Sequence, residues 1–174
     1  MNIKNNLGHS ADISLTAELS IPINGNNIID FKKLARLYKD ELLDNVLPFW
    51  LEHSQDNEYG GYFTCLDRDG RVFDTDKFIW LQGREVWMFS MLYNKVEKRQ
   101  EWLDCAILGG EFLKKYGHNG NYNWYFSLDR SGRPLVEPYN IFSYTFATMA
   151  FGQLSLATGS QEYADIAKKT FDII

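Results

Sequence analysis

The sequence has few of the residues that stabilise small secreted or metal-binding domains. It holds two cysteines, Cys65 and Cys105, and three histidines in 174 residues, with no CxxC pair. Two cysteines are too few for a disulfide framework, so we expect free thiols and a reducing compartment such as the cytoplasm. Because no other histidine or cysteine stands near His53 at the spacing of metal ligands, we expect no metal site.

Positive charge and long apolar runs are also scarce. The formal net charge of -5 argues against a nucleic-acid partner, which needs a basic surface to neutralise phosphates. No run of about 18 apolar residues could span a bilayer, and the N-terminus lacks the apolar core of a signal peptide. Neither GxxxxGK[ST] nor GxGxxG occurs. We therefore expect no nucleic-acid partner, no membrane partner and no common nucleotide-binding loop.

What the sequence does contain is helical periodicity interrupted by turn-rich stretches. Residues 1–27 are polar, Asn-rich and aperiodic, which predicts an extended or mobile N-terminal arm. From residue 28 to Phe49, apolar side chains recur every three or four positions and predict an amphipathic helix, which Pro48 would kink or end. The same periodicity predicts further helices over residues 76–96, 101–116, 141–158 and 160–174.

Two of the turn-rich stretches resemble each other. GYFTCLDRDGRVFD, residues 61–74, aligns with WYFSLDRSGRPLV, residues 124–136, after one gap, and Asp67 and Asp129 are 62 residues apart. Each stretch predicts a short β-hairpin between two helices. Such a helix–hairpin–helix repeat cannot bury its apolar face alone and must stack on its neighbours. The alternative is a chance similarity of two short hairpins.

The repeat predicts an all-α fold, an (α/α)6 barrel or six-hairpin toroid, with short β-hairpins between the helices. Helices 76–96 and 141–158 are apolar nearly all round and would form the inner layer, with 28–49 and 101–116 in the outer layer. A four-helix bundle would leave the hairpins unexplained. Since six such units need about 370 residues, we expect residues 28–174 to be the N-terminal part of a truncated barrel domain.

Arg84 is the strongest candidate for chemistry. It follows Trp80 by four residues, so the two share one face of an inner helix. A permanently charged guanidinium on an apolar face needs an anionic or polar partner. That partner is either a substrate or a structural carboxylate, such as Asp76 or Glu85. Gly83 weakens the helix by roughly 1 kcal/mol, which predicts a close backbone approach there.

Aromatic side chains at the mouth of such a barrel would suit a sugar ring, because they offer flat apolar faces and hydroxyl groups. The candidates are Trp80, Phe142, Tyr144 and Phe146.

Four aspartates around the first hairpin raise a glycosidase interpretation, which needs two carboxylates facing a sugar. The hairpin turn and helix capping explain them better. They are Asp67, Asp69, Asp74 and Asp76.

One long stretch resembles a known enzyme family. FWLEHSQDNEYGGYFTCLDRDGRVFDTDKFIWLQGREVWMFSMLY, with the later GGEFL and IFSYTFATMA segments, is similar to the N-terminal part of the N-acylglucosamine 2-epimerases, whose mammalian members are also called renin-binding proteins. The resemblance runs from Phe49 to Thr158 and is far more specific than a short motif.

The resemblance implies an (α/α)6 barrel that interconverts N-acetylglucosamine and N-acetylmannosamine by removing and returning the C2 proton of the open-chain sugar. It places Arg84 in the substrate pocket beside Trp80, where the developing enolate oxygen needs a hydrogen-bonding partner. It extends more weakly to Phe142, Tyr144 and Phe146. The resemblance also implies that no cofactor is chemically required and that ATP can activate the enzyme without being consumed. The expected partners are an amino sugar and a second copy in a homodimer.

The chain departs from the family pattern at two points. Many relatives have an acidic residue where this chain has Tyr144, which leaves the sugar uncertain. The catalytic histidines of the family come from later in the barrel, and His9, His53 and His118 do not match them. We therefore expect the 174 residues alone to be inactive. The alternatives are an aldose–ketose isomerase or another sugar 2-epimerase on the same barrel, and a non-catalytic interaction module that exposes its inner helices to a partner.

Overall fold

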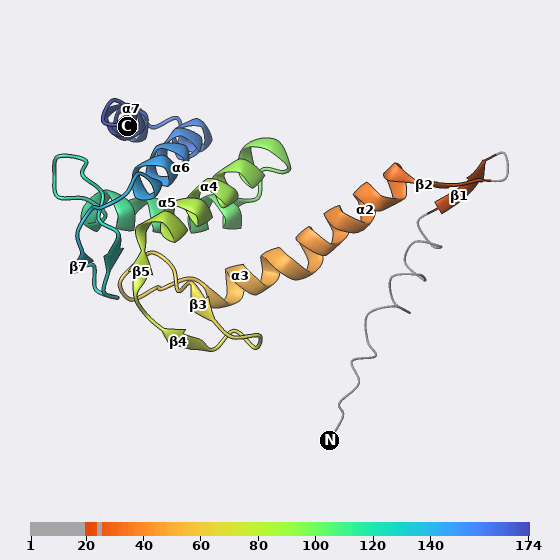
Figure 1. The fold of residues 1–174 in the computed structure, drawn as a ribbon, viewed down its shortest axis with the longest axis horizontal. Coiled ribbons are helices and arrows are strands. Elements are labelled where there is room, and N and C mark those ends of the chain that lie inside the picture. Colours follow the sequence, from red (N-terminus) through yellow and green to blue (C-terminus); the bar gives the residue numbers. More distant parts are fainter. Residues whose placement is uncertain (1–19, 24–25) are drawn as a thin grey trace, which may run out of the picture. The chain divides into compact units, whose positions relative to one another are not determined.

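The computed structural model describes residues 20–23 and 26–174, and it is mainly helical with short strands between the helices (Figure 1). The helical elements are α2 (Phe31–Glu41), the π-helical turn η1 (Leu42–Val46), α3 (Leu47–His53), α4 (Ile79–Lys95), α5 (Gln100–Tyr116), α6 (Phe142–Thr158) and α7 (Gln161–Phe171). The strands are β1 (Ser20–Ile23), β2 (Asn26–Ile29), β3 (Cys65–Leu66), β4 (Val72–Asp74), β5 (Lys77–Phe78), β6 (Ser127–Leu128) and β7 (Pro134–Val136). In the described part of the chain, no helix has both the length and the apolar character needed to cross a membrane.

The chain divides into two compact units on either side of the Pro48–Phe49 bond. In the N-terminal unit, β1 and β2 form an antiparallel pair, and Asp30 caps α2 by accepting hydrogen bonds from two backbone N–H groups at 3.0 and 3.1 Å. Most of the predicted arm, residues 1–27, lies outside the described residues. Its described end, residues 20–23 and 26–27, is extended and belongs to this strand pair.

The first helical segment differs from the prediction at both ends. It begins at Phe31 because β2 occupies the preceding residues, and it continues past Phe49 to His53. Pro48 therefore does not end it. Proline has no N–H to donate to the carbonyl four residues earlier, and its ring crowds that carbonyl. The helix widens into the π turn η1 directly before this point, and the Leu47 N–H bonds to the Leu42 carbonyl instead.

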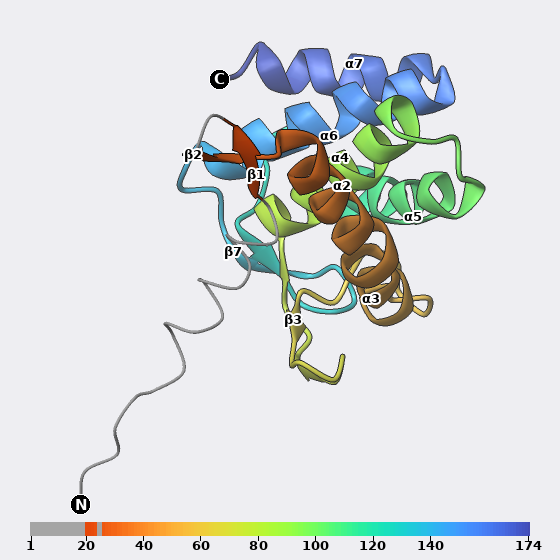
Figure 2. The same cartoon turned by 90° about the vertical axis from the view of Figure 1, so that its right-hand side faces the viewer.

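The second unit is built on two inner helices, as the sequence predicts. Helices α4 and α6 lie side by side, with α5 against α4 and α7 against α6 (Figures 1 and 2). Gly83 lets the two inner helices approach closely, because a Cβ atom there would lie 3.0 Å from the backbone carbonyl of Phe146. The predicted backbone contact at this glycine is confirmed. The inner-helix side chains that are fully buried include Ile79, Val86, Phe89, Ala147, Phe151 and Leu154.

The start of the first inner helix differs from the prediction by three residues. Lys77 and Phe78 form β5 and pair with Leu128 and Ser127 of the second hairpin, so the helix begins at Ile79. The Asp74 carboxylate accepts the Asp76 N–H at 2.9 Å and shapes a turn there. Neither aspartate caps the helix, whose N-cap is Phe78.

The two hairpins are confirmed as copies by their hydrogen bonds. The Asp67 N–H bonds to the Arg71 carbonyl at 3.0 Å, and the Asp129 N–H bonds to the Arg133 carbonyl at 2.8 Å. Each aspartate side chain also accepts the N–H of its arginine at 2.9 Å. Both hairpins carry a register shift, between Cys65 and Leu66 in the first and at the equivalent place in the second.

The glycines of the two hairpin turns also occupy equivalent places. Gly70 and Gly132 have φ angles of 79° and 93°, a left-handed conformation that favours glycine. A Cβ atom on Gly70 would overlap the ring of His53, and one on Gly132 would overlap the ring of Tyr116. His53 and Tyr116 end the outer helices α3 and α5. Each hairpin thus folds back onto the end of the outer helix of its own repeat.

A buried aromatic residue connects each repeat to the next outer helix. The Tyr62 hydroxyl donates to the Cys105 carbonyl of α5 at 2.7 Å, and the Trp124 indole N–H donates to the Thr170 hydroxyl of α7 at 3.0 Å. Both rings are fully buried. The structure therefore has two complete helix–hairpin–helix repeats followed by α7 in the position of a third outer helix. It confirms the predicted all-α class, the hairpins and the six-hairpin toroid, of which this chain is a part.

Candidate functional site

The first two turns of α4 carry the predicted aromatic and cationic site residues. Trp80 is half-buried, and its ring centroid lies 6.0 Å from that of Phe146 on α6, with the ring planes at 50°. The close approach at Gly83 brings the two helices near enough for this contact. The structure thus places Trp80 and Phe146 together, as expected of residues that line one surface.

Arg84 faces a different neighbour of α4. It is exposed, and within residues 20–23 and 26–174 its guanidinium makes neither a hydrogen bond nor an ion pair. The structural ion pair with Asp76 or Glu85 is therefore not formed. Arg84 lines a hollow of about 400 Å³ between α4 and the segment around α3. The other lining residues are Trp50, Thr64, Leu81, Glu85, Trp87 and Met88.

Glu85 is the second ionisable residue of this hollow. It is 7% exposed and accepts a hydrogen bond from the Ser54 hydroxyl at 2.6 Å. Burial raises the pKa of Glu85 to about 8, and the Ser54 hydrogen bond only partly opposes this shift. At neutral pH the protonated form predominates, so Glu85 does not neutralise Arg84.

Thr64 adds a polar group to the same hollow. Its Oγ1 atom is buried and finds no hydrogen-bond partner among the described residues. A buried hydroxyl without a partner loses its hydration without compensation. The hollow therefore combines a fixed positive charge, a neutral carboxyl group, an unpaired hydroxyl and two tryptophans, Trp50 and Trp87.

The remaining predicted residues lie on α6 and do not line the hollow of Arg84. Phe142 begins α6 and is 60% exposed. The Tyr144 hydroxyl donates to the Asn123 side chain at 3.3 Å. Helical spacing predicts a common face for Trp80 and Arg84, but the structure turns Trp80 toward α6 and Arg84 toward α3.

The sequence did not predict a buried ionic network that joins the two repeats. Asp56 and Lys77 are fully buried, and the Lys77 ammonium donates to the Asp56 carboxylate at 3.0 Å. Arg130 of the second hairpin donates two hydrogen bonds, of 2.9 and 3.0 Å, to the same carboxylate. Burial would raise the pKa of Asp56, but the hydrogen bonds from Arg130 and Lys77 prevail and hold it at about 2.

Arg130 also forms an ion pair with Glu58 at 2.9 Å, so two carboxylates balance the two cations of this network. Lys77 also donates to the carbonyls of Gly60 and Arg130, and its ammonium lies 4.3 Å from the centre of the Phe112 ring. Asp56 has both carboxylate oxygens occupied. Lys77 directly precedes the apolar residues 78–81, and this position is the one signal that could have indicated a buried ion pair. We interpret the network as a joint between repeats.

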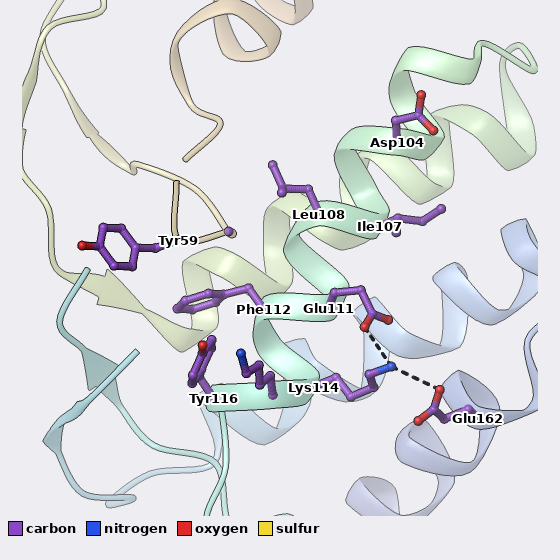
Figure 3. Close-up of a pocket in the computed structure, with 11 residues that line it drawn as sticks. Tyr59, Asp104, Ile107, Leu108, Glu111, Phe112, Lys114, Tyr116 and Glu162 are labelled. Atoms are coloured by element: carbon purple, nitrogen blue, oxygen red, sulfur yellow. Dashed lines mark hydrogen bonds and ion pairs between the residues drawn. The ribbon is translucent and has the colours of Figure 1, made fainter. Parts of the chain in front are cut away.

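A hollow of about 700 Å³ lies on the outer face of α5, away from the predicted site (Figure 3). Lys114 sits there between Glu111 at 2.9 Å and Glu162 of α7 at 3.2 Å. The Tyr163 hydroxyl also donates to Glu111 at 2.5 Å. The lysine is thus already neutralised by two carboxylates, and the cluster joins the outer helices α5 and α7.

Neither described histidine lies in the hollow of Arg84. His53 packs against Phe49, with ring centroids 5.0 Å apart. The Nδ1 atom of His118 accepts the Gly120 N–H at 3.0 Å, and burial lowers the pKa of His118. His9 lies outside the described residues. A pair of bases next to Arg84 is therefore absent from the described part of the chain.

Comparison with known proteins identifies what this chain resembles. The family model for N-acylglucosamine 2-epimerase (GlcNAc 2-epimerase) matches residues 61–174. N-acylglucosamine 2-epimerase of Mus musculus is 46% identical over 139 residues, which cover 78% of this chain and 33% of that protein. Cellobiose 2-epimerase of Dictyoglomus turgidum is 28% identical over 148 residues, which cover 84% of this chain and 38% of that protein.

A solved structure agrees with the fold. Cellobiose 2-epimerase from Bacillus thermoamylovorans matches with a TM-score of 0.76 and 28% identity, covering 83% of this chain and 37% of that one. The chain thus spans about a third of the length of the curated relatives that it matches. The family match covers well over half of the chain. The protein belongs to the N-acylglucosamine 2-epimerase family of sugar epimerases.

Proposed function

We propose that the whole protein carrying these residues is a sugar 2-epimerase that interconverts N-acetylglucosamine and N-acetylmannosamine. The observation that carries the proposal is Arg84, a cation on an inner helix with no ionic partner within the described residues. Sequence identity of 46% to N-acylglucosamine 2-epimerase of Mus musculus supports this substrate class over others in the family.

The proposed chemistry is transfer of the C2 proton of the open-chain sugar. A base removes the proton that the neighbouring aldehyde acidifies, and an acid returns a proton to the opposite face. The electron pair moves onto the aldehyde oxygen and forms an enolate. The Arg84 guanidinium donates hydrogen bonds to that oxygen and stabilises its negative charge, an interaction that is strongest in the transition state.

The aromatic residues hold the sugar in this proposal. Trp80 and Phe146 offer two adjacent ring faces at 50° to each other, onto which the apolar C–H face of a sugar can pack. Phe142, exposed at the start of α6, and Tyr144 contribute further contacts. Because Arg84 lies one helical turn from Trp80 but lines the hollow toward α3, the proposal requires the sugar to extend along α4 from the two rings to the guanidinium.

The acid and base are not supplied by the described residues. His53 and His118 are engaged in packing and backbone hydrogen bonds. We propose that two histidines from later repeats of the whole protein carry the proton. The 174-residue chain on its own is therefore expected to bind sugar weakly and to catalyse no epimerisation.

The test is proton exchange at C2 in deuterated water, followed by NMR with N-acetylglucosamine and N-acetylmannosamine. The whole protein is expected to exchange the C2 proton and interconvert the sugars. Arg84→Met is expected to lower kcat/KM by about 100-fold or more, because one donor to a developing oxyanion is lost. Arg71→Met, an exposed arginine paired within the first hairpin, is the matched control. Unchanged activity of Arg84→Met would refute the role of Arg84.

A second candidate is another 2-epimerase or an aldose–ketose isomerase on the same barrel, and the similarity to cellobiose 2-epimerases favours it. Assays with cellobiose and free mannose separate these from the first proposal. A non-catalytic interaction module is the remaining alternative. It predicts that the whole protein turns over none of these sugars.

The proposal extends to regulation, assembly and location. By family resemblance, ATP would activate the enzyme without being consumed, no other cofactor would be needed, and the enzyme would be a homodimer. The two free thiols, Cys65 and Cys105, suit a reducing compartment such as the cytoplasm. Activity measured with and without ATP, the mass in solution and cell fractionation test these three points.

A further inference from the structure

The junction between the two repeats has a strand component and an ionic component. Strand β5, which follows the first hairpin, pairs with β6 of the second hairpin, with Lys77 opposite Leu128. Beyond β6, Arg130 reaches back to the buried Asp56 carboxylate in the turn of the first repeat. A hairpin therefore docks onto the repeat before it through one strand edge and one arginine.

The first hairpin carries the same two components, and both lack a partner. Arg68 follows Asp67 as Arg130 follows Asp129, and β3 corresponds to β6. Strand β6 pairs on both sides, with β5 and β7, whereas β3 pairs only with β4 in the described part of the chain. Arg68 is exposed and makes no hydrogen bond or ion pair with any described residue.

The two hairpins have the same backbone geometry, so the strand edge and the arginine occupy equivalent positions in each hairpin. The aspartate–arginine hydrogen bonds that close the turns are equivalent, as are the left-handed glycines and the register shifts. We propose that the free edge of β3, together with Arg68, is the docking surface for the last helix–hairpin–helix repeat of the closed ring. That repeat supplies a strand to Cys65–Leu66 and a carboxylate to Arg68.

The last repeat is the expected occupant because each hairpin docks onto the repeat that precedes it. The strand that pairs with β6 comes from the repeat before it. In a closed ring, the repeat before the first is the last. The chain spans 33% of the relative from Mus musculus, which leaves room for such repeats. The inference depends on the whole protein closing a ring, and it does not depend on the proposed epimerase activity.

A second copy of this chain does not fit the surface as well. In the second repeat, Asn119 takes the place of Asp56, since its N–H bonds to the Asn123 carbonyl as the Asp56 N–H bonds to the Gly61 carbonyl. Tyr139 takes the place of Lys77, 62 residues later. A second copy that docked its second repeat onto β3 would therefore offer Arg68 an amide in place of a carboxylate. The neutral amide provides no counter-charge for the guanidinium.

The test compares Arg68→Met in the whole protein and in the 174-residue chain by thermal unfolding. In the whole protein, we expect Arg68→Met to lower Tm by at least about twice as much as the Arg71→Met control does, because it removes an ion pair that the hairpin itself does not supply. In the 174-residue chain, the partner is missing and we expect a change below about 1 °C. The control Arg71→Met, whose partner Asp67 lies in the same hairpin, should behave alike in both proteins.

A second measurement needs no variant. Hydrogen exchange at Cys65 and Leu66 is expected to be at least about tenfold slower in the whole protein than in the 174-residue chain, because a new strand covers this edge. Equal exchange rates, or an Arg68→Met effect no larger than that of Arg71→Met, would overturn the proposal. A natural protein that stops at Ile174 would also overturn it, since no last repeat could then supply the strand.

Discussion

The Asp56 carboxylate, in the turn of the first repeat, is held by the Arg130 guanidinium of the second hairpin through hydrogen bonds of 2.9 and 3.0 Å. The two residues are 74 positions apart in the sequence. Lys77 completes the network from the strand that precedes the first inner helix. A single buried carboxylate thus fixes the relative positions of three segments.

Asp56→Asn is expected to destabilise the 174-residue chain strongly, because it leaves the buried Lys77 ammonium without a counter-charge. Removing one partner of a buried ion pair costs about 3–5 kcal/mol. Urea unfolding followed by circular dichroism measures this change. Arg133→Met is the control, since its partner Asp129 lies in the same turn and the arginine is exposed. A loss no greater than that of the control would contradict the assigned role of the network.

The same network gives a signature at low pH. The pKa of Asp56 is held at about 2, below its ordinary value of 3.8. A carboxyl group with a lowered pKa stabilises the fold above its unfolded-state pKa, and this stabilisation is lost as the pH falls through the folded-state value. Wild type is therefore expected to lose stability between about pH 4 and pH 2. The Asp56→Asn variant should lose less over that window.

Glu85 is expected to produce the opposite pH dependence. Burial raises its pKa from 4.5 to about 8, so the folded state holds the proton more tightly than the unfolded chain does. Its contribution to stability is complete below pH 4.5 and declines as the pH rises toward 8, by at most about 1.4 kcal/mol per pH unit. Glu85→Gln should remove this decline and be more stable than wild type above pH 7.

Unfolding midpoints in urea from pH 5 to 8.5 measure the effect of Glu85. Glu137→Gln, at an exposed glutamate next to β7, is the control and should follow the wild-type curve. If wild type and Glu85→Gln have parallel pH profiles, then Glu85 does not change its protonation state with the predicted pKa.

Two glycines on the inner helices should respond in opposite directions to substitution by alanine. A Cβ atom on Gly83 would lie 3.0 Å from the Phe146 backbone and would push α4 and α6 apart, whereas one on Gly152 would meet no atom within 4 Å. We expect Gly83→Ala to destabilise by about 1–2 kcal/mol. Gly152→Ala should stabilise by up to about 1 kcal/mol through helix propensity. Equal free energies of unfolding for the two variants would show that the helices are not closely apposed at Gly83.

The hydrogen bond between Trp124 and Thr170 can be measured by a double-mutant cycle. Trp124→Phe leaves a buried hydroxyl without a donor, and Thr170→Val leaves a buried indole N–H without an acceptor. Each loss is expected to cost about 1–3 kcal/mol. The double variant should recover about 1 kcal/mol relative to the sum of the singles. Additive effects in urea unfolding would indicate that α7 is not held by this bond.

The fold was largely predictable from the sequence because its information is local and repeated. Helical periodicity located the inner helices, and the matching LDRDGR and LDRSGR turns revealed the repeat. Element ends were less predictable. The pairing of Lys77 and Phe78 with the second hairpin moved the start of α4, and this pairing joins residues about 50 positions apart.

The candidate site was only partly predictable. The spacing of Trp80 and Arg84 indicates a shared helix face, but which neighbour each side chain meets depends on where α3 and α6 lie. The pairing of Trp80 with Phe146 and the hollow beside Arg84 are consequences of tertiary packing. The Asp56–Lys77–Arg130 network needs three segments that are brought together only by folding. A local pattern cannot contain that information.

The different residues at equivalent positions of the two repeats have a consequence for folding. Two hairpins with nearly the same backbone could exchange places while the chain collapses. A hairpin docked one repeat out of step would bring its arginine to Asn119 and leave Asp56 and Lys77 buried without it. Such a mis-stacked intermediate carries uncompensated charge in its interior. The non-identical junctions therefore discourage stacking in the wrong order and favour the order in which the repeats occur along the chain.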